Sequence, residues 1–411
     1  MVELLAPVGN FESLQAAIDA GADAIYFGTT HLNMRTLGST NFTFKELPEL
    51  VKRCHDKNIR CYMTVNSIVY NNEASQVEEV LINAKNAGVD AVIAWDLMVL
   101  QKAKELGIEI HLSTQASISN FEALKFYADF GIPRIVLARE LDLPQIIEIK
   151  KKIKEAGMKT EIECFIHGAM CIAVSGRCFM SQITACKSAN RGQCIQVCRR
   201  KYKITDVEEG TELILDNQYV MSPKDMCTMP IIDKILDAGI EVLKIEGRAR
   251  SPEYVKTVVE AYREAINLHE KGELTEDAKE ILIKKMEKVY NRGFSTGFYN
   301  GVPMHEWAGV YGSKATTRKV LLGQLTNYYN QSEVAEVKID SDSISKGDQY
   351  YIIGPTTGVI EGKLPEIMID EKINSQARKG DIITFKAPKA RVGDKFYKIV
   401  NIEENSDLIQ S

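Results

Sequence analysis

The sequence predicts an α/β protein: a TIM-type (β/α)8 barrel with a smaller C-terminal all-β barrel domain. The first observation is a short unit that occurs three times and joins a helical pattern to an apolar run. The second is the number of such apolar runs, about eight, between amphipathic helical patterns. The third is a change to short alternating runs in the last quarter of the chain. Eight βα units favour a closed barrel.

The repeated unit occupies 20–28, 87–94 and 238–245, where Ala-Gly-Ala-Asp, Ala-Gly-Val-Asp and Ala-Gly-Ile-Glu precede the apolar run. Each copy follows a helix-like stretch. The glycine suits the end of a helix, and the apolar run suits a parallel strand that is buried on both faces. Each copy therefore marks the junction between a helix and the next strand.

The expected strands recur along the first 245 residues, with amphipathic helical patterns such as 75–87 and 145–156 between them. An open, doubly wound sheet is the main alternative, but eight strands favour the closed barrel. The eight runs lie near 4–6, 24–27, 60–65, 91–94, 109–112, 134–137, 161–165 and 242–245.

The connection between strands seven and eight is much longer than the others, at about 75 residues. Loops of this length are usually functional. We expect the barrel to span 1–305, with this cysteine-rich insertion at about 166–240 and helices over 252–270 and 276–290. From about Lys319, alternating runs separated by Lys-Gly-Asp turns predict a small all-β barrel or sandwich, so 306–411 is expected to hold a linker and the β domain.

The composition is that of a globular protein: 411 residues, 45% hydrophobic and 26% charged, with a net charge of −5. This charge argues against a general nucleic-acid-binding protein, so any RNA surface must be local. No apolar run reaches about 18 residues, and the N-terminus lacks the pattern of a signal peptide. We therefore expect a cytoplasmic protein without a membrane span.

Nine cysteines are present, and seven of them crowd into 164–227. The cytoplasm disfavours disulfides, and thiolates bind zinc or the iron of iron–sulfur clusters. The wide, irregular spacings suit a cubane cluster better than a zinc ribbon, although spacing alone leaves a redox or structural role open. The cysteines expected to be ordinary buried thiols are Cys54, Cys61, Cys164 and Cys186.

Polar residues follow several expected strands at the end where TIM barrels carry their active sites. Glu246 and Arg248 follow strand eight, and His167 follows strand seven. A guanidinium beside a carboxylate can orient an anion, and an imidazole suits acid–base catalysis. The alternatives are a rim salt bridge and a structural histidine. Four more residues at strand ends are expected to line the same pocket: Arg35, Asn66, Gln115 and Arg139.

The stretch 187–203 carries six basic residues and no acidic one. Such a local patch is suited to RNA phosphates, although a solvated loop explains the charge equally well. The residues expected to contact RNA are Lys187, Arg191, Arg199, Arg200 and Lys201.

These segments resemble the peptidase U32 family, also called collagenase-like proteases. The resemblance rests on the motif over 163–178 (ECFIHGAMCIAVSGRC) and on shorter matches at 3–9 (ELLAPVG), 191–194 (RGQC) and 244–248 (KIEGR). It covers nearly the whole chain. One departure is Val174, where the family usually has an aromatic residue.

The resemblance implies a fold and a chemistry. The family name implies proteolysis, but members are implicated in oxygen-independent hydroxylation of ubiquinone precursors, a ribosomal RNA cytidine or the wobble uridine of tRNA. It also implies a 4Fe-4S cluster and prephenate as the source of the hydroxyl group. Carried over to this sequence, the cluster ligands are Cys171, Cys178, Cys194 and Cys227, with Cys198 in reserve, and zinc is the lesser alternative.

On this interpretation the chain is an enzyme that forms 5-hydroxyuridine at the tRNA wobble position, with His167 and Glu246 as catalytic candidates. Arg35, Arg139 and Arg248 would hold a dicarboxylate such as prephenate. The basic stretch and the β domain would bind tRNA, and a homologous subunit is a further candidate partner. Two alternatives remain: a U32-type peptidase, for which no metal motif or Cys-His dyad is recognisable, and a non-enzymatic RNA-binding assembly factor.

Overall fold

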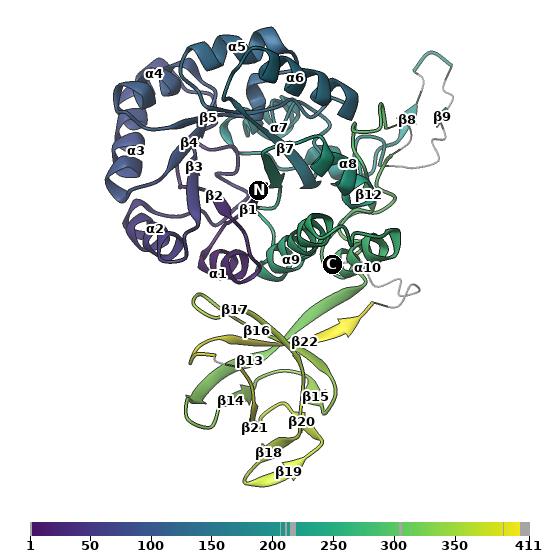
Figure 1. Ribbon diagram of the computed structural model, residues 1–411. Coiled ribbons are helices and arrows are strands. Elements are labelled where there is room, and N and C mark those ends of the chain that lie inside the picture. Colours follow the sequence, from purple (N-terminus) through teal and green to yellow (C-terminus); the bar gives the residue numbers. More distant parts are fainter. Residues whose placement is uncertain are drawn as a thin grey trace.

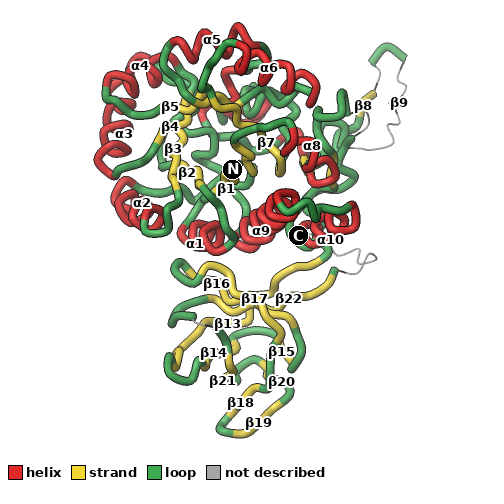
Figure 2. The backbone as a smooth tube through the Cα atoms, in the orientation of Figure 1, coloured by secondary structure: helices red, strands yellow, loops and turns green. Residues whose placement is uncertain are grey.

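The computed structural model describes residues 2–205, 207–209, 212–213, 219–303, 306–388 and 390–402. It has two parts, a ring of strands enclosed by helices and a β domain (Figures 1 and 2). The β domain lies beside helices α1 (Phe11–Asp19) and α9 (Pro252–Glu270) of the ring.

Within the described residues, eight parallel strands form a closed ring. The strand β11 pairs with both β7 and β1, which closes it. The predicted TIM-type barrel is therefore confirmed. Its strands are β1 (Glu3–Pro7), β2 (Ala24–Gly28), β3 (Arg60–Thr64), β4 (Ala91–Ala94), β5 (Ile110–Leu112), β6 (Arg134–Val136), β7 (Glu161–Gly168) and β11 (Val242–Ile245).

Helices cover the outside of the ring, and local signals in the sequence define their ends (Figure 2). The Asn10 side chain accepts the backbone N–H of Ser13 at the start of α1. Gly88, with φ of 79°, ends α3 in the left-handed conformation. The other barrel helices are α2 (Leu47–His55), α3 (Ala74–Ala87), α4 (Leu97–Glu105), α5 (Phe121–Asp129), α6 (Leu143–Glu155) and α8 (Ile232–Asp237), and α10 (Glu276–Glu287) follows α9.

Alternate residues of each strand face opposite sides of the ring wall. Ile25 and Val92 pack outward in the main core, under the helices. Tyr26 and Ile93 belong to a smaller apolar cluster that also contains Leu5. This alternation decides which side chains reach the barrel interior.

The insertion after β7 is anchored at the mouth of the barrel. It contains α7 (Met180–Ala185), the short pair β8 (Ile204–Thr205) and β9 (Glu212–Leu213), and β10 (Asp225–Cys227). β10 runs antiparallel to β7 and parallel to β12 (Phe294–Ser295). The long connection therefore extends the barrel sheet at one edge of the mouth.

The C-terminal part is an antiparallel sheet, which confirms the all-β prediction. Eight of its described strands follow the order β17-β16-β22-β13-β14-β21-β18-β19, and no pairing among described residues closes this sheet into a ring. The strands are β13 (Thr317–Tyr329), β14 (Val334–Ile339), β15 (Ser343–Ser345), β16 (Gln349–Gly354), β17 (Gly358–Lys363), β18 (Ile367–Ile369), β19 (Lys372–Asn374), β20 (Gln376–Arg378), β21 (Ile382–Lys386) and β22 (Lys395–Asn401).

The two parts share a packed apolar contact. Ala16 of α1 is buried in a cluster with Tyr351, Val359 and Ile399 of the sheet. Lys319 and Glu253 add an ion pair of 2.8 Å across the contact. In the part of the chain that the structure describes, no helix has the length and apolar character needed to cross a membrane.

Candidate functional site

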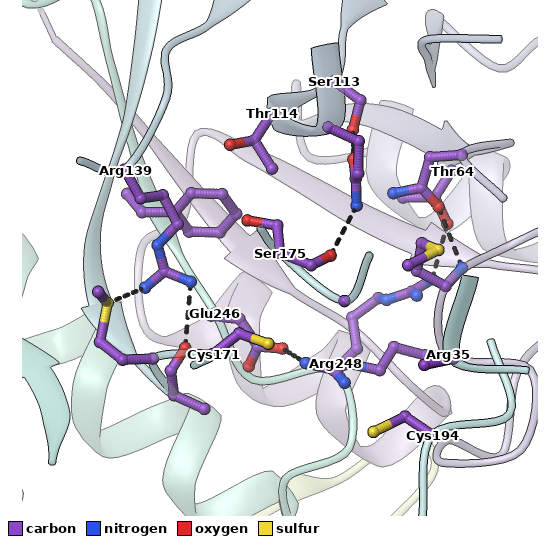
Figure 3. Close-up of a pocket in the computed structure, with 18 of the residues that line it drawn as sticks. Arg35, Thr64, Ser113, Thr114, Arg139, Cys171, Ser175, Cys194, Glu246 and Arg248 are labelled. Atoms are coloured by element: carbon purple, nitrogen blue, oxygen red, sulfur yellow. Dashed lines mark hydrogen bonds and ion pairs between the residues drawn. The ribbon is translucent and has the colours of Figure 1, made fainter. Parts of the chain in front are cut away.

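A cavity of about 130 Å³ opens at the mouth of the barrel, and the insertion covers one side of it. Figure 3 shows arginine, hydroxyl and thiol side chains gathered around it. Six residues that the sequence singled out as catalytic or substrate-binding line it: Arg35, Asn66, Gln115, Arg139, Glu246 and Arg248.

Strand β11 delivers a row of charged side chains to this cavity. Because side chains alternate along a strand, Lys244 and Glu246 point to the same side, and both line the cavity together with Arg248. Arg35 donates to Glu246 across 2.6 Å. Burial alone would raise the pKa of Glu246, but Arg35 holds it below its ordinary range, so the carboxylate stays ionised.

Arg248 is buried and crosses the interior of the barrel beside β2. Its guanidinium donates to the Thr64 hydroxyl at 2.7 Å and to Asn33 Oδ1 at 3.0 Å. A Cβ atom at Gly28 would lie 2.2 Å from Arg248 Nη1, so only glycine leaves room for this path. Burial lowers the pKa of Arg248.

Arg139 enters the cavity from the loop after β6 and stacks 4.6 Å from the centre of the Phe165 ring. It donates to the Ala169 carbonyl at 3.1 Å and to Met170 Sδ at 2.9 Å. Its Nε atom is buried without a hydrogen-bond partner. A buried N–H without a partner carries a free-energy cost, which an anionic or polar ligand in the cavity would remove.

Three of the cavity arginines have no carboxylate partner. Among the described residues, no carboxylate lies within 4 Å of the guanidinium groups of Arg139, Arg199 or Arg248. Arg199 donates to the Ser222 hydroxyl and to carbonyl oxygens instead. The cavity thus has more positive than negative charge, which suits a ligand with more than one anionic group.

Thiols face the same cavity. Cys171, Cys194 and Cys198 line it, and the charge on Cys198 is affected by those of Cys171, Cys194 and Cys178. Burial raises the pKa of Cys198, the other thiols raise it further, and Arg199 opposes them. Cys171, Cys194 and Cys198 therefore lie together at the mouth, and the electrostatic effect of Cys178 on Cys198 indicates that Cys178 is near them.

Backbone donors approach three of these sulfurs in the same way. The N–H groups of Ala173, Met180 and Gln196 point at Cys171, Cys178 and Cys194, respectively, each from two residues further along the chain and each at 3.4 Å. Such N–H···S hydrogen bonds stabilise thiolates and are one means by which proteins tune iron–sulfur clusters.

Cys227 lies elsewhere. It is 2% exposed, belongs to the main apolar core, and accepts a hydrogen bond from the Tyr262 hydroxyl at 3.8 Å. Burial raises its pKa to about 11. It does not line the cavity, so the thiol that the sequence placed in reserve, Cys198, lies with the other three instead.

The spacing of the four thiols separates the two candidate metals. Zinc–sulfur bonds of about 2.3 Å would bring four sulfurs to within about 3.8 Å of one another. Among the described residues, no three of these sulfurs lie within 4.8 Å of one another. A cubane binds each thiolate to a different iron and needs wider separations than a single zinc ion does.

His167 does not reach the cavity. Alternation from Phe165 would turn it inward, but the register of β7 against β11 slips, so that Lys244 lies opposite Phe165 and Ile245 opposite His167. The ring instead packs against Tyr262, whose hydroxyl is 3.3 Å from Nδ1. Burial lowers the pKa of His167 to about 3. The catalytic role expected for His167 therefore has no support from its position.

The residues of the basic stretch have different surroundings. Arg199 lies inside the cavity, and Arg191 pairs with Glu73 and lies over Tyr70. Lys187, Arg200 and Lys201 are exposed. Of the five residues predicted to contact RNA, these last three are exposed enough to meet a large polyanion at the surface.

The sequence interpretation left out two cations of the cavity. Lys244 is 2.6 Å from the buried Glu163 and lies on the same face of β11 as Glu246, so strand alternation could have identified it. Arg292 follows α10 and pairs with Asp225 at 3.2 Å. No pattern in the sequence indicates that Arg292 would reach the barrel mouth.

Comparison with known proteins settles the family. The model of peptidase family U32 matches residues 9–309. The chain belongs to peptidase family U32.

Relatives within family U32 carry names of two kinds. A protein of Porphyromonas gingivalis named collagenase is 44% identical over 409 residues, which cover 98% of this chain and 99% of that one. The tRNA hydroxylation protein P1 of Bacillus subtilis is 35% identical over 365 residues, which cover 86% of this chain and 83% of that one. An Escherichia coli 23S rRNA 5-hydroxycytidine synthase is 34% identical over 305 residues, 73% of this chain and 45% of that one.

Among solved structures, the U32 peptidase Mk0906 is 12% identical to this chain, with a TM-score of 0.41 over 60% of this chain and 94% of that one. The strand pairings described above, rather than this likeness, define the barrel.

Proposed function

We propose that this protein is an oxygen-independent RNA hydroxylase that forms 5-hydroxyuridine at the wobble position of tRNA. The observation that carries the proposal is one cavity lined by three thiols, with Cys178 near them, and by three arginines that lack carboxylate partners among the described residues. A cysteine peptidase needs neither the excess of cations nor the second, third and fourth thiols. The relatives named for tRNA and rRNA hydroxylation support an RNA substrate.

In this proposal Cys171, Cys178, Cys194 and Cys198 hold a 4Fe-4S cluster. The cluster would supply one-electron chemistry. The backbone N–H groups that point at three of the sulfurs would stabilise their thiolate forms. Arg199, next to Cys198, would offset part of the negative charge of the bound thiolates.

The co-substrate in this proposal is a small dicarboxylate such as prephenate. Arg139 and Arg248 would bind its carboxylates, because both present charge that no protein carboxylate neutralises. Arg35 is tied to Glu246, so this pair would orient the ligand rather than balance its charge. Exposed Lys187, Arg200 and Lys201 would contact tRNA phosphates near the mouth.

The test is mass spectrometry of tRNA nucleosides from a deletion strain that also lacks any paralogue. We expect 5-hydroxyuridine derivatives to disappear and to return when the wild-type gene is supplied. Cys171→Ser should fail to restore them. Cys186→Ser is the matched control, because Cys186 lies in the same insertion but is exposed and outside the cavity. Unchanged nucleosides in the deletion strain would contradict the proposal.

A peptidase is the second candidate, favoured by the 44% identity to a protein named collagenase. A cysteine peptidase needs a histidine beside its thiol. In the described residues no histidine lines the cavity, and His167 packs against aromatic rings behind the wall. Cleavage of gelatin by purified, metal-free protein, lost in Cys171→Ser and kept in Cys186→Ser, would favour this candidate.

A further inference from the structure

An exposed arginine lies over a tryptophan at the rim of the cavity. The guanidinium carbon of Arg177 is 5.0 Å from the centre of the Trp95 ring. Trp95 follows β4, whereas Arg177 belongs to the insertion, so the pair joins the barrel wall to the segment that covers it. Arg177 is exposed and Trp95 is half-buried.

Both partners are held by groups that belong to the cavity wall. The Trp95 indole N–H donates to the Asn66 carbonyl at 2.7 Å, and Arg177 donates to the Gln115 carbonyl at 3.1 Å. Asn66 and Gln115 line the cavity. The stacked pair therefore lies next to the cavity opening with its orientation fixed from both sides.

A tight turn sets the position of Arg177. The Arg177 N–H donates to the Val174 carbonyl at 2.9 Å, and the two residues between them, Ser175 and Gly176, have φ values of 45° and 96°. Positive φ at both central residues is typical of a two-residue hairpin turn of type I′. The turn places Ser175 and Gly176 in the cavity wall and Arg177 directly outside it.

Within the described part of the chain the charge of Arg177 has no carboxylate partner, unlike that of a similar pair nearby. Arg191 lies 4.5 Å from the centre of the Tyr70 ring, but Glu73 neutralises it. Among the described residues no carboxylate forms an ion pair with Arg177. An exposed flat cation on an aromatic ring, without a counter-charge, is suited to a partner that offers both a π-face and negative charge.

We propose that Arg177 and Trp95 form a stacking platform for a nucleobase of single-stranded RNA, next to the nucleotide that enters the cavity. Bases of unpaired RNA stack on aromatic rings and on guanidinium planes, and the adjacent phosphates supply the negative charge. This inference rests on the proposed RNA substrate and identifies which face of the mouth receives the strand.

The two tryptophans of the chain make a direct test available. In Trp307→Phe, Trp95 is the only tryptophan, so its fluorescence reports on the platform alone. Titration with single-stranded oligouridylate should quench this fluorescence. Inorganic polyphosphate, which has charge but no bases, should not. Binding to RNA is measured in parallel by filter retention.

Arg177→Ala, which removes the stacked cation, should weaken retention of oligouridylate by about 5- to 150-fold. This is the range measured for the loss of one stacked base. Lys125→Ala, which removes an exposed cation of α5 outside the basic stretch and the β domain, is the charge-matched control and should change retention by less than about twofold. Trp95→Phe should keep more affinity than Trp95→Ala, because phenylalanine still offers a ring.

Two failures can be told apart. Retention of RNA without quenching of Trp95, or equal effects of Arg177→Ala and Lys125→Ala, would overturn the platform and leave the RNA substrate intact. No retention of RNA by the wild-type protein would overturn the platform together with the proposed function. Equal quenching by polyphosphate would show that charge alone is recognised and would also overturn the platform.

Discussion

The two ends of the barrel interior both bury charge, but they balance it differently. At the floor, where the strands begin, Arg134 is 1% exposed and lies 2.7 Å from both Glu3 and Glu161. Halfway up, Lys244 is 2.6 Å from Glu163. At the mouth, the hydrogen-bond acceptors of Arg139, Arg199 and Arg248 among the described residues are hydroxyl, amide, carbonyl and thioether groups.

This difference separates structure from function. A buried ion pair that is fully matched holds its elements in register, and breaking it leaves an uncompensated charge. Buried cations without counter-charges are unfavourable in the free protein and are expected where an anion binds. The floor should therefore dominate stability, and the mouth should dominate ligand binding.

The largest effect on stability is expected at the floor. Arg134→Met should lower the free energy of unfolding by about 3–5 kcal/mol, because it removes the buried cation shared by Glu3 and Glu161 and leaves Glu3 with the half-exposed Arg60. Urea denaturation followed by circular dichroism measures this. A loss of less than about 1 kcal/mol in the free energy of unfolding would mean that the charges at the floor are solvated. It would contradict the view that the floor dominates stability and the mouth dominates ligand binding.

The ion pair of Lys244 with Glu163, halfway up the barrel, should make the protein sensitive to acid. Burial alone would raise the pKa of Glu163, but Lys244 and Arg134 lower it below its ordinary range. A carboxylate with a lowered pKa stabilises the fold above the pKa that it has in the unfolded chain, and this contribution is lost as the pH falls through its folded-state pKa. The free energy of unfolding should therefore decrease as the pH is lowered from about 5. In Glu163→Gln this decrease per pH unit should be smaller. An equal decrease per pH unit in the wild type and in Glu163→Gln would contradict a stabilising role for the Glu163 carboxylate.

A smaller loss of stability is expected where the mouth is tightly packed. Gly28→Ala places a Cβ atom 2.2 Å from Arg248 Nη1, so the guanidinium must move. We expect a loss of about 1–3 kcal/mol in the free energy of unfolding, the usual cost of overpacking. Gly38→Ala is the matched control, because nothing lies within 4 Å of a Cβ atom there. Equal stability of the two variants would show that Arg248 does not depend on Gly28.

The smallest effect on stability is expected for Arg248→Met, with a change of about 1 kcal/mol or less, since no carboxylate is left unpaired. Its effect on ligand binding should be large. Affinity for prephenate, measured by titration calorimetry, should fall about tenfold or more, as the loss of a charged hydrogen bond implies. Unchanged affinity would separate Arg248 from the anion site.

The sequence predicted the barrel well because its signals are local. Glycines that end helices, such as Gly88, and apolar runs, such as 91–94, define each βα unit without reference to the rest of the chain. The residues at strand ends, including Arg139 and Glu246, also meet in one cavity, because parallel strands of a barrel all point to the same mouth.

The exceptions depend on details of pairing and path. A register slip of one residue turns His167 away from the cavity, and no sequence pattern reveals such a slip. The path of the long insertion brings Cys198 to the other thiols. It places Cys227 in β10, opposite His167 of β7. Spacing along the chain does not determine that path, so it could not choose between the two cysteines.

The choice between Cys198 and Cys227 is also the most direct test of the account. Wild-type protein, Cys198→Ser and Cys227→Ser are purified without oxygen, and iron and acid-labile sulfide are measured per chain. The account predicts about four iron atoms in the wild type, retention of most of them in Cys227→Ser, and their loss in Cys198→Ser. Loss of iron in Cys227→Ser with retention in Cys198→Ser, or zinc in place of iron in the wild type, would contradict it.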